Sequence, residues 1–182
     1  MMDIVVNDTN ILIDMHTAGL LDYIRMSKVK FHTVDLVVDE LRRSSYKRPL
    51  IEELINEGML YVSKASSEEM AEILELYSVY SNNTNLSFVD CSVMLYAKKN
   101  RYRLLTSDKK LRNHAIDEGV IVSGLLWVVD LFVDEGLVTP VDMIERLNNL
   151  FRANNRLPKK LIEDKIKRLQ GMIDDAKTLL VR

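Results

Sequence analysis

Two acidic residues occupy equivalent places in a repeated sequence pattern. Asp8 follows the short β-branched run 4–6 and precedes a segment with helical spacing, and Asp108 follows the apolar run 102–106 and precedes another. Because the carboxyl ends of parallel strands meet at one edge of an α/β sheet, we expect both carboxylates to face the same crevice. Asp is also a common helix cap, so a purely structural role at each helix start is the alternative.

Two further acids lie on predicted helices. Glu40 lies at the edge of the apolar stripe of segment 34–41, and Asp90 lies inside the mostly apolar segment 86–97. Burying a lone carboxylate is costly, so Asp90 needs a partner, and a metal ion would be one. The alternatives are a surface position for Glu40 and, for Asp90, an ion pair with a buried basic residue or a helix that starts later than predicted.

The four carboxylates together predict a metal site. Carboxylates that converge repel one another and raise one another's pKa unless a cation lies between them. Oxygen ligands favour a hard divalent cation, so the expected metal is Mg²⁺ or Mn²⁺. Such a cation, present as one ion or as two, would lower the pKa of a water molecule and stabilise charge on an attacked phosphate. The pattern therefore suits phosphodiester hydrolysis.

An alternation of strands and helices has to position these acids. We expect strands at residues 4–6, 29–33, 60–62, 102–106 and 120–122, with helices between and after them. This order predicts an α/β fold of three layers, α/β/α, with a central parallel sheet of about five strands. No Gly-rich phosphate loop follows the first strand, which disfavours a nucleotide-binding doubly wound protein.

The chain of 182 residues fits one domain with a small appendage. We predict an α/β/α domain at 1–136 and a helical C-terminal extension at 137–182 that packs on or beside it. Residues 1–139 hold 15 Lys and Arg against 21 Asp and Glu, a balance of −6, whereas residues 140–182 hold 10 against 6, a balance of +4. The basic extension is either a solvated helical surface or a surface that meets a polyanion.

Composition and hydropathy indicate the compartment. The apolar runs are too short to span a bilayer, and no basic segment leads into a long apolar one near the N-terminus, so we expect neither a membrane segment nor a secretory signal. The single Cys91 excludes an internal disulfide framework, and three His with one Cys do not make a zinc cluster. We therefore expect a cytoplasmic protein.

The motifs around the four acids resemble those of the PIN-domain family, the fold of many Mg²⁺- or Mn²⁺-dependent ribonucleases, including VapC-type toxins. The similarity covers roughly residues 3–123. Its motifs are Asp8-Thr9-Asn10 followed by three aliphatic residues, Glu40 within 38–41, Asp90 before an apolar helix that ends near residue 97, and Asp108 within 105–108.

The resemblance implies roles for these residues. The metal ligands would be Asp8, Glu40, Asp90 and Asp108, and the supporting polar groups would be Thr9, Asn10 and Thr106, the last also a hydrogen-bond partner of the substrate phosphate. The motif favours Glu40 over Asp39 without deciding between them. Basic residues that follow the acids would contact an RNA backbone, namely Arg42, Arg43, Lys47 and Arg48, and also Lys109, Lys110 and Arg112. The alternative for both groups is a solvated surface.

Two functions follow from the resemblance. The first is a metal-dependent endoribonuclease, with the toxin of a toxin–antitoxin pair as one identity, which implies RNA as substrate, an antitoxin protein as partner and a homodimer. The second is a catalytically weak or inactive PIN-like module that binds nucleic acid or protein. The segment 123–137 favours the second, because it is similar to a PIN subgroup described as nucleic-acid-binding proteins.

Overall fold

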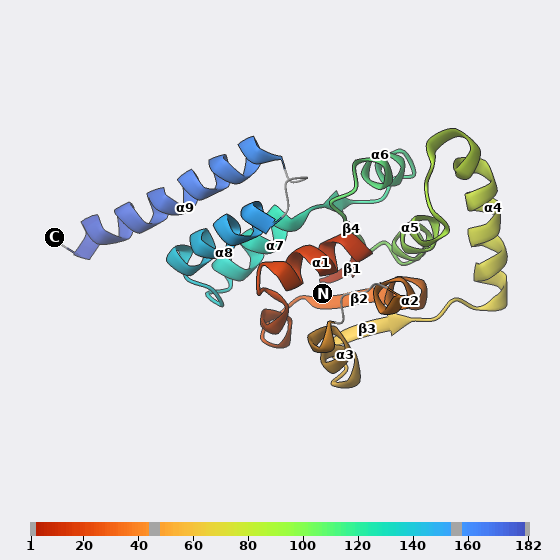
Figure 1. Ribbon diagram of the computed structural model, residues 1–182, viewed down its shortest axis with the longest axis horizontal. Coiled ribbons are helices and arrows are strands. Elements are labelled where there is room, and N and C mark those ends of the chain that lie inside the picture. Colours follow the sequence, from red (N-terminus) through yellow and green to blue (C-terminus); the bar gives the residue numbers. More distant parts are fainter. Residues whose placement is uncertain (1–2, 44–47, 154–157, 181–182) are drawn as a thin grey trace.

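A parallel sheet of five strands lies at the centre of the computed structural model, which describes residues 3–43, 48–153 and 158–180 (Figure 1). The strands lie in the order β3-β2-β1-β4-β5. Their bounds are β1 (Ile4–Asn7), β2 (Lys30–Val34), β3 (Leu60–Ser63), β4 (Arg103–Leu105) and β5 (Val122–Ser123). The predicted α/β fold with a parallel sheet of about five strands is confirmed.

β1 lies in the middle of the sheet because its side chains can be buried on both faces. Val5 and Val6 are almost fully inaccessible to solvent, as expected for a parallel strand covered on both sides. β1 pairs with β2 on one side, and on the other it pairs with β4 through Asn7 opposite Leu105. The carboxyl ends of β1 and β4 are therefore adjacent, and the turns that follow them lie together.

Helices cover both faces of the sheet. Before β4 they are α1 (Thr9–Thr17), the 3₁₀ helix η1 (Leu21–Arg25), α2 (Asp35–Arg43), α3 (Pro49–Asn56), α4 (Ser67–Thr84) and α5 (Phe88–Asn100). After it come α6 (Lys109–Asp117), α7 (Leu125–Asp134), α8 (Pro140–Ala153) and α9 (Lys159–Leu180). On one face Tyr96 of α5 lies 3.0 Å from the His32 ring of β2, and on the other Phe132 of α7 packs against Phe31. Within the described ranges, no helix is both long and apolar enough to cross a membrane.

Most predicted boundaries differ from the structure by one or two residues, and capping explains two of these differences. The helix predicted at 86–97 begins at Phe88, so Asp90 lies in its first turn and not in its interior. The fifth strand begins at Val122, because the Val120 N–H donates to a carbonyl at the end of α6 and continues that helix's cap. Both differences come from capping hydrogen bonds, which shift an element's end by one or two residues.

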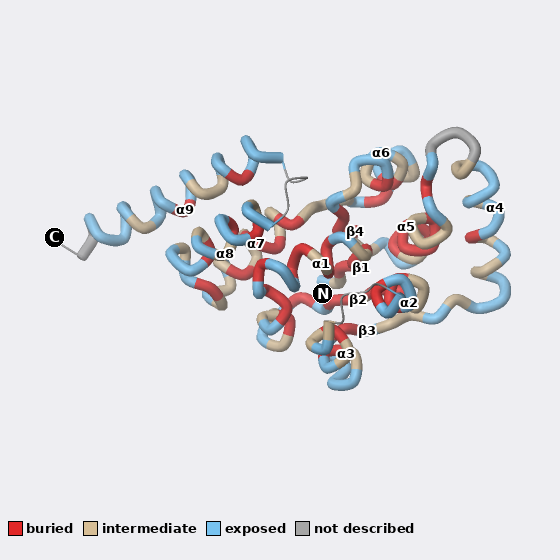
Figure 2. Tube along the Cα trace, in the orientation of Figure 1, coloured by how far each residue is buried: buried red, intermediate tan, exposed pale blue. Residues whose placement is uncertain are grey.

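The C-terminal helices continue the core of the sheet domain. α8 packs on α1 and α7 and buries three side chains, those of Met143, Leu147 and Leu150. α9 lies along α8, against which Ile162 and Leu169 are buried. Figures 1 and 2 show that the far end of α9 extends beyond the body of the protein and is exposed on most of its surface. The predicted division at residue 136 stays a prediction.

Candidate active site

Asp8 is the first residue after β1, and only 3% of it is exposed. Its Oδ1 accepts a hydrogen bond of 2.7 Å from the Ile11 N–H and so caps α1. Its Oδ2 accepts a hydrogen bond from the hydroxyl group of Thr106, which follows β4. Asp8 is therefore a helix cap, as the alternative expected, and at the same time a carboxylate at the carboxyl edge of the sheet.

Asp108 repeats this arrangement at the end of β4. Its Oδ1 accepts hydrogen bonds from the N–H groups of Lys110 (2.7 Å) and Leu111 (2.9 Å), which caps α6. Its own N–H donates to the Thr106 hydroxyl oxygen at 2.9 Å. The Thr106 hydroxyl thus joins Asp8 to Asp108, and the predicted convergence of the two turns is present in the structure.

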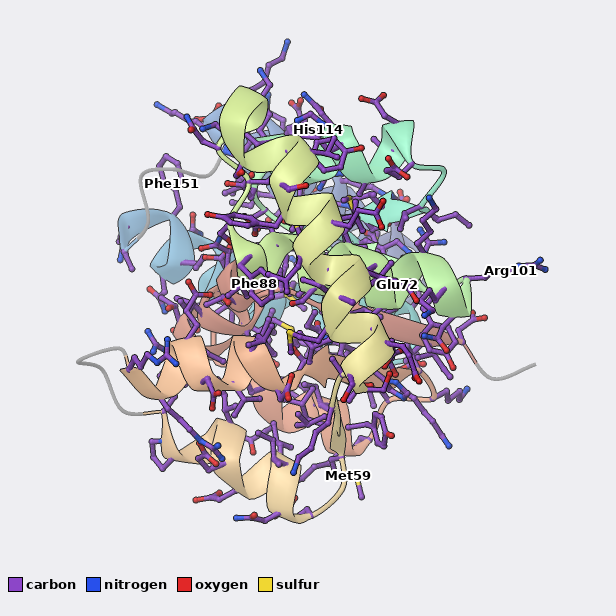
Figure 3. The ribbon with its side chains drawn as sticks, turned by 90° about the vertical axis from the view of Figure 1, so that its right-hand side faces the viewer. Met59, Glu72, Phe88, Arg101, His114 and Phe151 are labelled. Carbon is purple, nitrogen blue, oxygen red and sulfur yellow. The ribbon has the colours of Figure 1, made fainter. Side chains whose placement is uncertain are left out.

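Asp90 reaches the same edge from the first turn of α5. It forms a capping box with Ser87: the Asp90 N–H donates to Ser87 Oγ at 3.0 Å, and Asp90 Oδ2 accepts from the Ser87 N–H (2.9 Å) and hydroxyl (2.8 Å). Phe88, labelled in Figure 3, anchors this helix start, because its ring packs edge to face on Tyr77 of α4. The two ring centroids are 5.7 Å apart. The cap and this contact together place the Asp90 carboxylate.

Glu40 is held at the site by α1. The Thr9 hydroxyl donates a hydrogen bond to Glu40 Oε2 and so connects the first turn of α1 to α2. Asp39, the competing candidate, is directed to Arg42, with 3.9 Å between Asp39 Oδ1 and Arg42 Nη1. The structure therefore brings Glu40, and not Asp39, to the other acids, with Thr9 as its supporting group. Asn10 is exposed on the same helical turn.

Neighbouring carboxylates contribute to a raised pKa at Asp8 and at Asp90. Burial raises the pKa of Asp8 to about 7, and the carboxylates of Asp90 and Asp14 add to this rise. Burial also raises the pKa of Asp90, with contributions from the charges of Asp108 and Glu40. Such effects of one charge on another group require proximity. The four predicted acids therefore share one electrostatic environment, in which a cation would relieve the repulsion.

Asp14 is an acid near the site that the sequence reasoning missed. It is 3% exposed on α1, and its Oδ2 accepts a hydrogen bond of 2.9 Å from the hydroxyl of Ser107, between Thr106 and Asp108. This contact holds the turn after β4 against α1. Its position in the apolar segment after Asp8 was the available signal, because a buried acid among aliphatic residues needs a partner.

The basic residues that were predicted to contact RNA have different surroundings in the structure. Arg42 binds Glu52 of α3 through two hydrogen bonds of 2.8 Å, so its charge links α2 to α3. Arg43 is exposed, Arg48 is half-buried, and Lys47 lies outside the described residues. Of the basic residues after Asp108, Lys109 and Lys110 are exposed. Arg112 is partly buried and donates to the Thr106 carbonyl at 2.8 Å.

The four acids supply only oxygen ligands, which is the donor set that Mg²⁺ and Mn²⁺ prefer. Among the described residues no hydrogen bond reaches Asp90 Oδ1 or Asp108 Oδ2, so each has lone pairs to offer. Across the same ranges, no three His, Cys, Asp or Glu side chains are grouped closely enough to hold an ion as they stand. The donor chemistry fits a hard divalent cation, whereas the present spacing of the carboxylates does not form a cage.

The chain is similar to known PIN proteins. A family model described as a PIN domain matches residues 4–171. Among solved structures, PAE2754 from Pyrobaculum aerophilum is 14% identical, with 76% of this chain and 98% of that chain covered and a TM-score of 0.52. A PilT N-terminus domain protein, SSO1118, from the archaeon Sulfolobus solfataricus P2 is 17% identical, with 72% and 92% covered and a TM-score of 0.47. No curated protein matches the chain.

The chain belongs to the PIN-domain family, because the family model covers nearly all of it, including α8 and part of α9. The predicted family resemblance is confirmed. PIN domains are generally nucleases and typically use divalent metal ions, so the chain has a nuclease-type fold. At 14% identity, the likeness to PAE2754 supports the fold alone.

Proposed function

We propose that this protein is a metal-dependent endoribonuclease that hydrolyses phosphodiester bonds of RNA. The observation that carries the proposal is the convergence of acids from separate segments: Asp8 and Asp108 after adjacent strands, with Asp90 from the start of α5. Each is costly to place near the others without a cation. The membership in a family of nucleases supports the same reading.

In this proposal Asp8, Glu40, Asp90 and Asp108 hold Mg²⁺ or Mn²⁺. When bound, such an ion lowers the pKa of a water molecule and stabilises charge on the attacked phosphate. The residues of the chain hold their carboxylates in place: Thr106 binds Asp8, Ser87 binds Asp90, and Thr9 binds Glu40. We infer that the carboxylates draw together when a cation offsets their repulsion, because their present spacing forms no cage.

The substrate side of the proposal rests on exposed basic residues near the acids. Lys109 and Lys110 begin α6 directly after Asp108, and Arg43 ends α2. Lysine and arginine side chains bind the RNA backbone through its phosphates, in a salt-dependent way. The toxin role, an antitoxin partner, a homodimer and a cytoplasmic location remain sequence-based predictions.

The test combines metal binding with RNA cleavage on the same samples. Calorimetric titration with Mn²⁺ and cleavage of a labelled RNA are measured for wild type and for Asp8→Asn with Asp90→Asn. Asp142→Asn is a matched control, because Asp142 also binds its helix's cap hydroxyl (Thr139, 2.8 Å) but lies on α8. Circular dichroism establishes that each variant is folded.

We expect wild type and Asp142→Asn to bind Mn²⁺ and cleave RNA, and the double variant to do neither while folded. Wild-type protein that binds no Mn²⁺ at millimolar concentration and cleaves no RNA would overturn the proposal. Retention of RNA binding in that case would favour the non-catalytic PIN-like module. Cleavage that survives in the double variant would show that these acids are not the catalytic ligands.

A further inference from the structure

Arg112 is bound to the backbone at the end of β4, next to the candidate active site. Its side chain starts one turn into α6 and runs back to the end of β4, where Nη2 donates to the Thr106 carbonyl at 2.8 Å. The residue is only partly exposed. Its guanidinium therefore binds the backbone of the residue whose hydroxyl joins Asp8 and Asp108.

Gly124 makes room for this contact. A Cβ atom at Gly124 would lie 2.9 Å from Arg112 Nη2 and 3.5 Å from the Thr106 carbonyl oxygen. The backbone φ of Gly124 is −128°, which any residue adopts, so backbone freedom does not explain a glycine here. The missing side chain does, because any Cβ at this position would displace the end of the Arg112 side chain.

We propose that Arg112 is a positioning residue of the site and that Gly124 is the position that admits it. Arg112 fixes the Thr106 peptide, and the Thr106 hydroxyl in turn sets the Asp8 carboxylate and the Asp108 backbone. Groups that bond directly to a metal ligand contribute about 10- to 100-fold to metal affinity or activity. Arg112 acts one contact further out, through Thr106, so we expect an effect at the lower end of this range. This inference rests on the proposed function for its catalytic consequence, but its local geometry can be tested without it.

The variants are Arg112→Met, which removes the donor, Arg112→Lys, which keeps a cation, and Gly124→Ala, which pushes the guanidinium from its place. The matched control is Arg146→Met. Arg146 also donates to backbone carbonyls, at 3.2 Å to Ala18 and 2.7 Å to Gly19, and a Cβ at Gly19 would lie 2.6 Å from its Nη1. This second arginine–glycine pair joins α8 to the end of α1, away from the four acids.

The first measurement is amide hydrogen exchange by NMR at Asp108, whose N–H is bound to Thr106 Oγ1. We expect exchange at Asp108 to quicken about 10-fold in Arg112→Met and Gly124→Ala, and to stay unchanged in Arg146→Met. This result does not depend on metal or RNA. Unchanged exchange in both site variants would overturn the proposal even if the protein proves to be a nuclease.

The second measurement is a double-mutant cycle on Mn²⁺ affinity and RNA cleavage. Arg112→Met and Gly124→Ala should each weaken Mn²⁺ binding about 10-fold, and the double variant no further, because both act through one contact. Arg112→Lys should recover part of the loss. Additive losses would show that Gly124 acts independently of Arg112. If Arg146→Met lowers Mn²⁺ affinity and RNA cleavage equally, the losses come from lower overall stability and not from the position of Arg112. If wild type binds no Mn²⁺, the nuclease proposal fails. The hydrogen-exchange measurement alone then tests whether Arg112 positions Thr106.

Discussion

The hydroxyl of Thr106 donates a hydrogen bond to the carboxylate of Asp8, which lies 98 positions earlier in the chain. The same hydroxyl oxygen accepts the N–H of Asp108 at 2.9 Å. One buried side chain therefore connects the ends of two adjacent parallel strands and two of the four acids. The sheet already brings the two strand ends together, since the Asp8 N–H donates to the Leu105 carbonyl at 3.2 Å. The Thr106 hydroxyl adds a side-chain connection that orients the Asp8 carboxylate relative to Asp108.

Thr106→Val removes both hydrogen bonds and keeps the shape of the side chain. We expect the free energy of unfolding to fall by about 1–3 kcal/mol, since the buried Asp8 oxygen and Asp108 N–H lose their partner. RNA cleavage should fall with it. Urea unfolding and a cleavage assay measure both effects. Thr106→Ser, which keeps the hydroxyl, is the control and should restore most of the activity; full activity in Thr106→Val would contradict the assigned role.

Asp8→Asn should change how the stability of the metal-free protein depends on pH. Because burial raises the pKa of Asp8 from 3.8 to about 7, the folded protein holds this proton more tightly than the unfolded chain. The unfolding free energy therefore falls as pH rises from about 4 to about 7. Asn does not titrate, and its side-chain oxygen still accepts a hydrogen bond from the Ile11 N–H. The variant should therefore be more stable than wild type at pH 8, by as much as about 4 kcal/mol. At pH 4 the two proteins should be similarly stable.

Thermal unfolding at both pH values, with and without Mn²⁺, measures this difference. Saturating Mn²⁺ should stabilise the wild type at pH 8 and leave Asp8→Asn unchanged. If the variant is less stable than wild type at pH 8 without metal, the ionised Asp8 carboxylate does not destabilise the folded protein, and this prediction is wrong.

Ser87→Ala removes the cap that orients Asp90. The matched variant is Ser66→Ala, since Ser66 forms the same capping box with Glu69 at the start of α4. Each change should cost about 1 kcal/mol of stability. Only Ser87→Ala should weaken Mn²⁺ binding, because only its partner belongs to the site. Calorimetry measures Mn²⁺ affinity and thermal melts measure stability for both variants. Equal Mn²⁺ affinities in the two variants would show that Asp90 is not part of the metal site.

Glu40→Gln and Asp39→Asn distinguish two neighbouring acids on α2. Both side chains are exposed, so each change should alter stability by less than about 0.5 kcal/mol. Glu40→Gln should reduce Mn²⁺ affinity and RNA cleavage, because Glu40 is held toward the other acids by Thr9. Asp39→Asn should leave both unchanged, since Asp39 is directed to Arg42. The opposite pattern would exchange the two assignments.

The amino-acid sequence by itself was sufficient to predict the sheet and the approach of Asp8 to Asp108. Both depend on local signals: a short β-branched run, a capping residue type and a helical spacing repeat twice, and parallel strands must present their carboxyl ends to one edge. The capping box of Ser66 with Glu69 is local in the same way, because its two partners are three residues apart.

Only the tertiary structure decided the contacts between distant segments. The spacing of α2 indicates which face Arg42 and Glu40 occupy, but the partner depends on which element packs there: Arg42 meets Glu52 of α3, and Glu40 meets Thr9 of α1. From the sequence alone, Arg112 is a candidate RNA contact, and only the structure shows that it binds the Thr106 carbonyl. Periodicity determines the direction of a side chain relative to its own helix, whereas a long-range partner depends on how whole elements pack, and no local pattern contains that information.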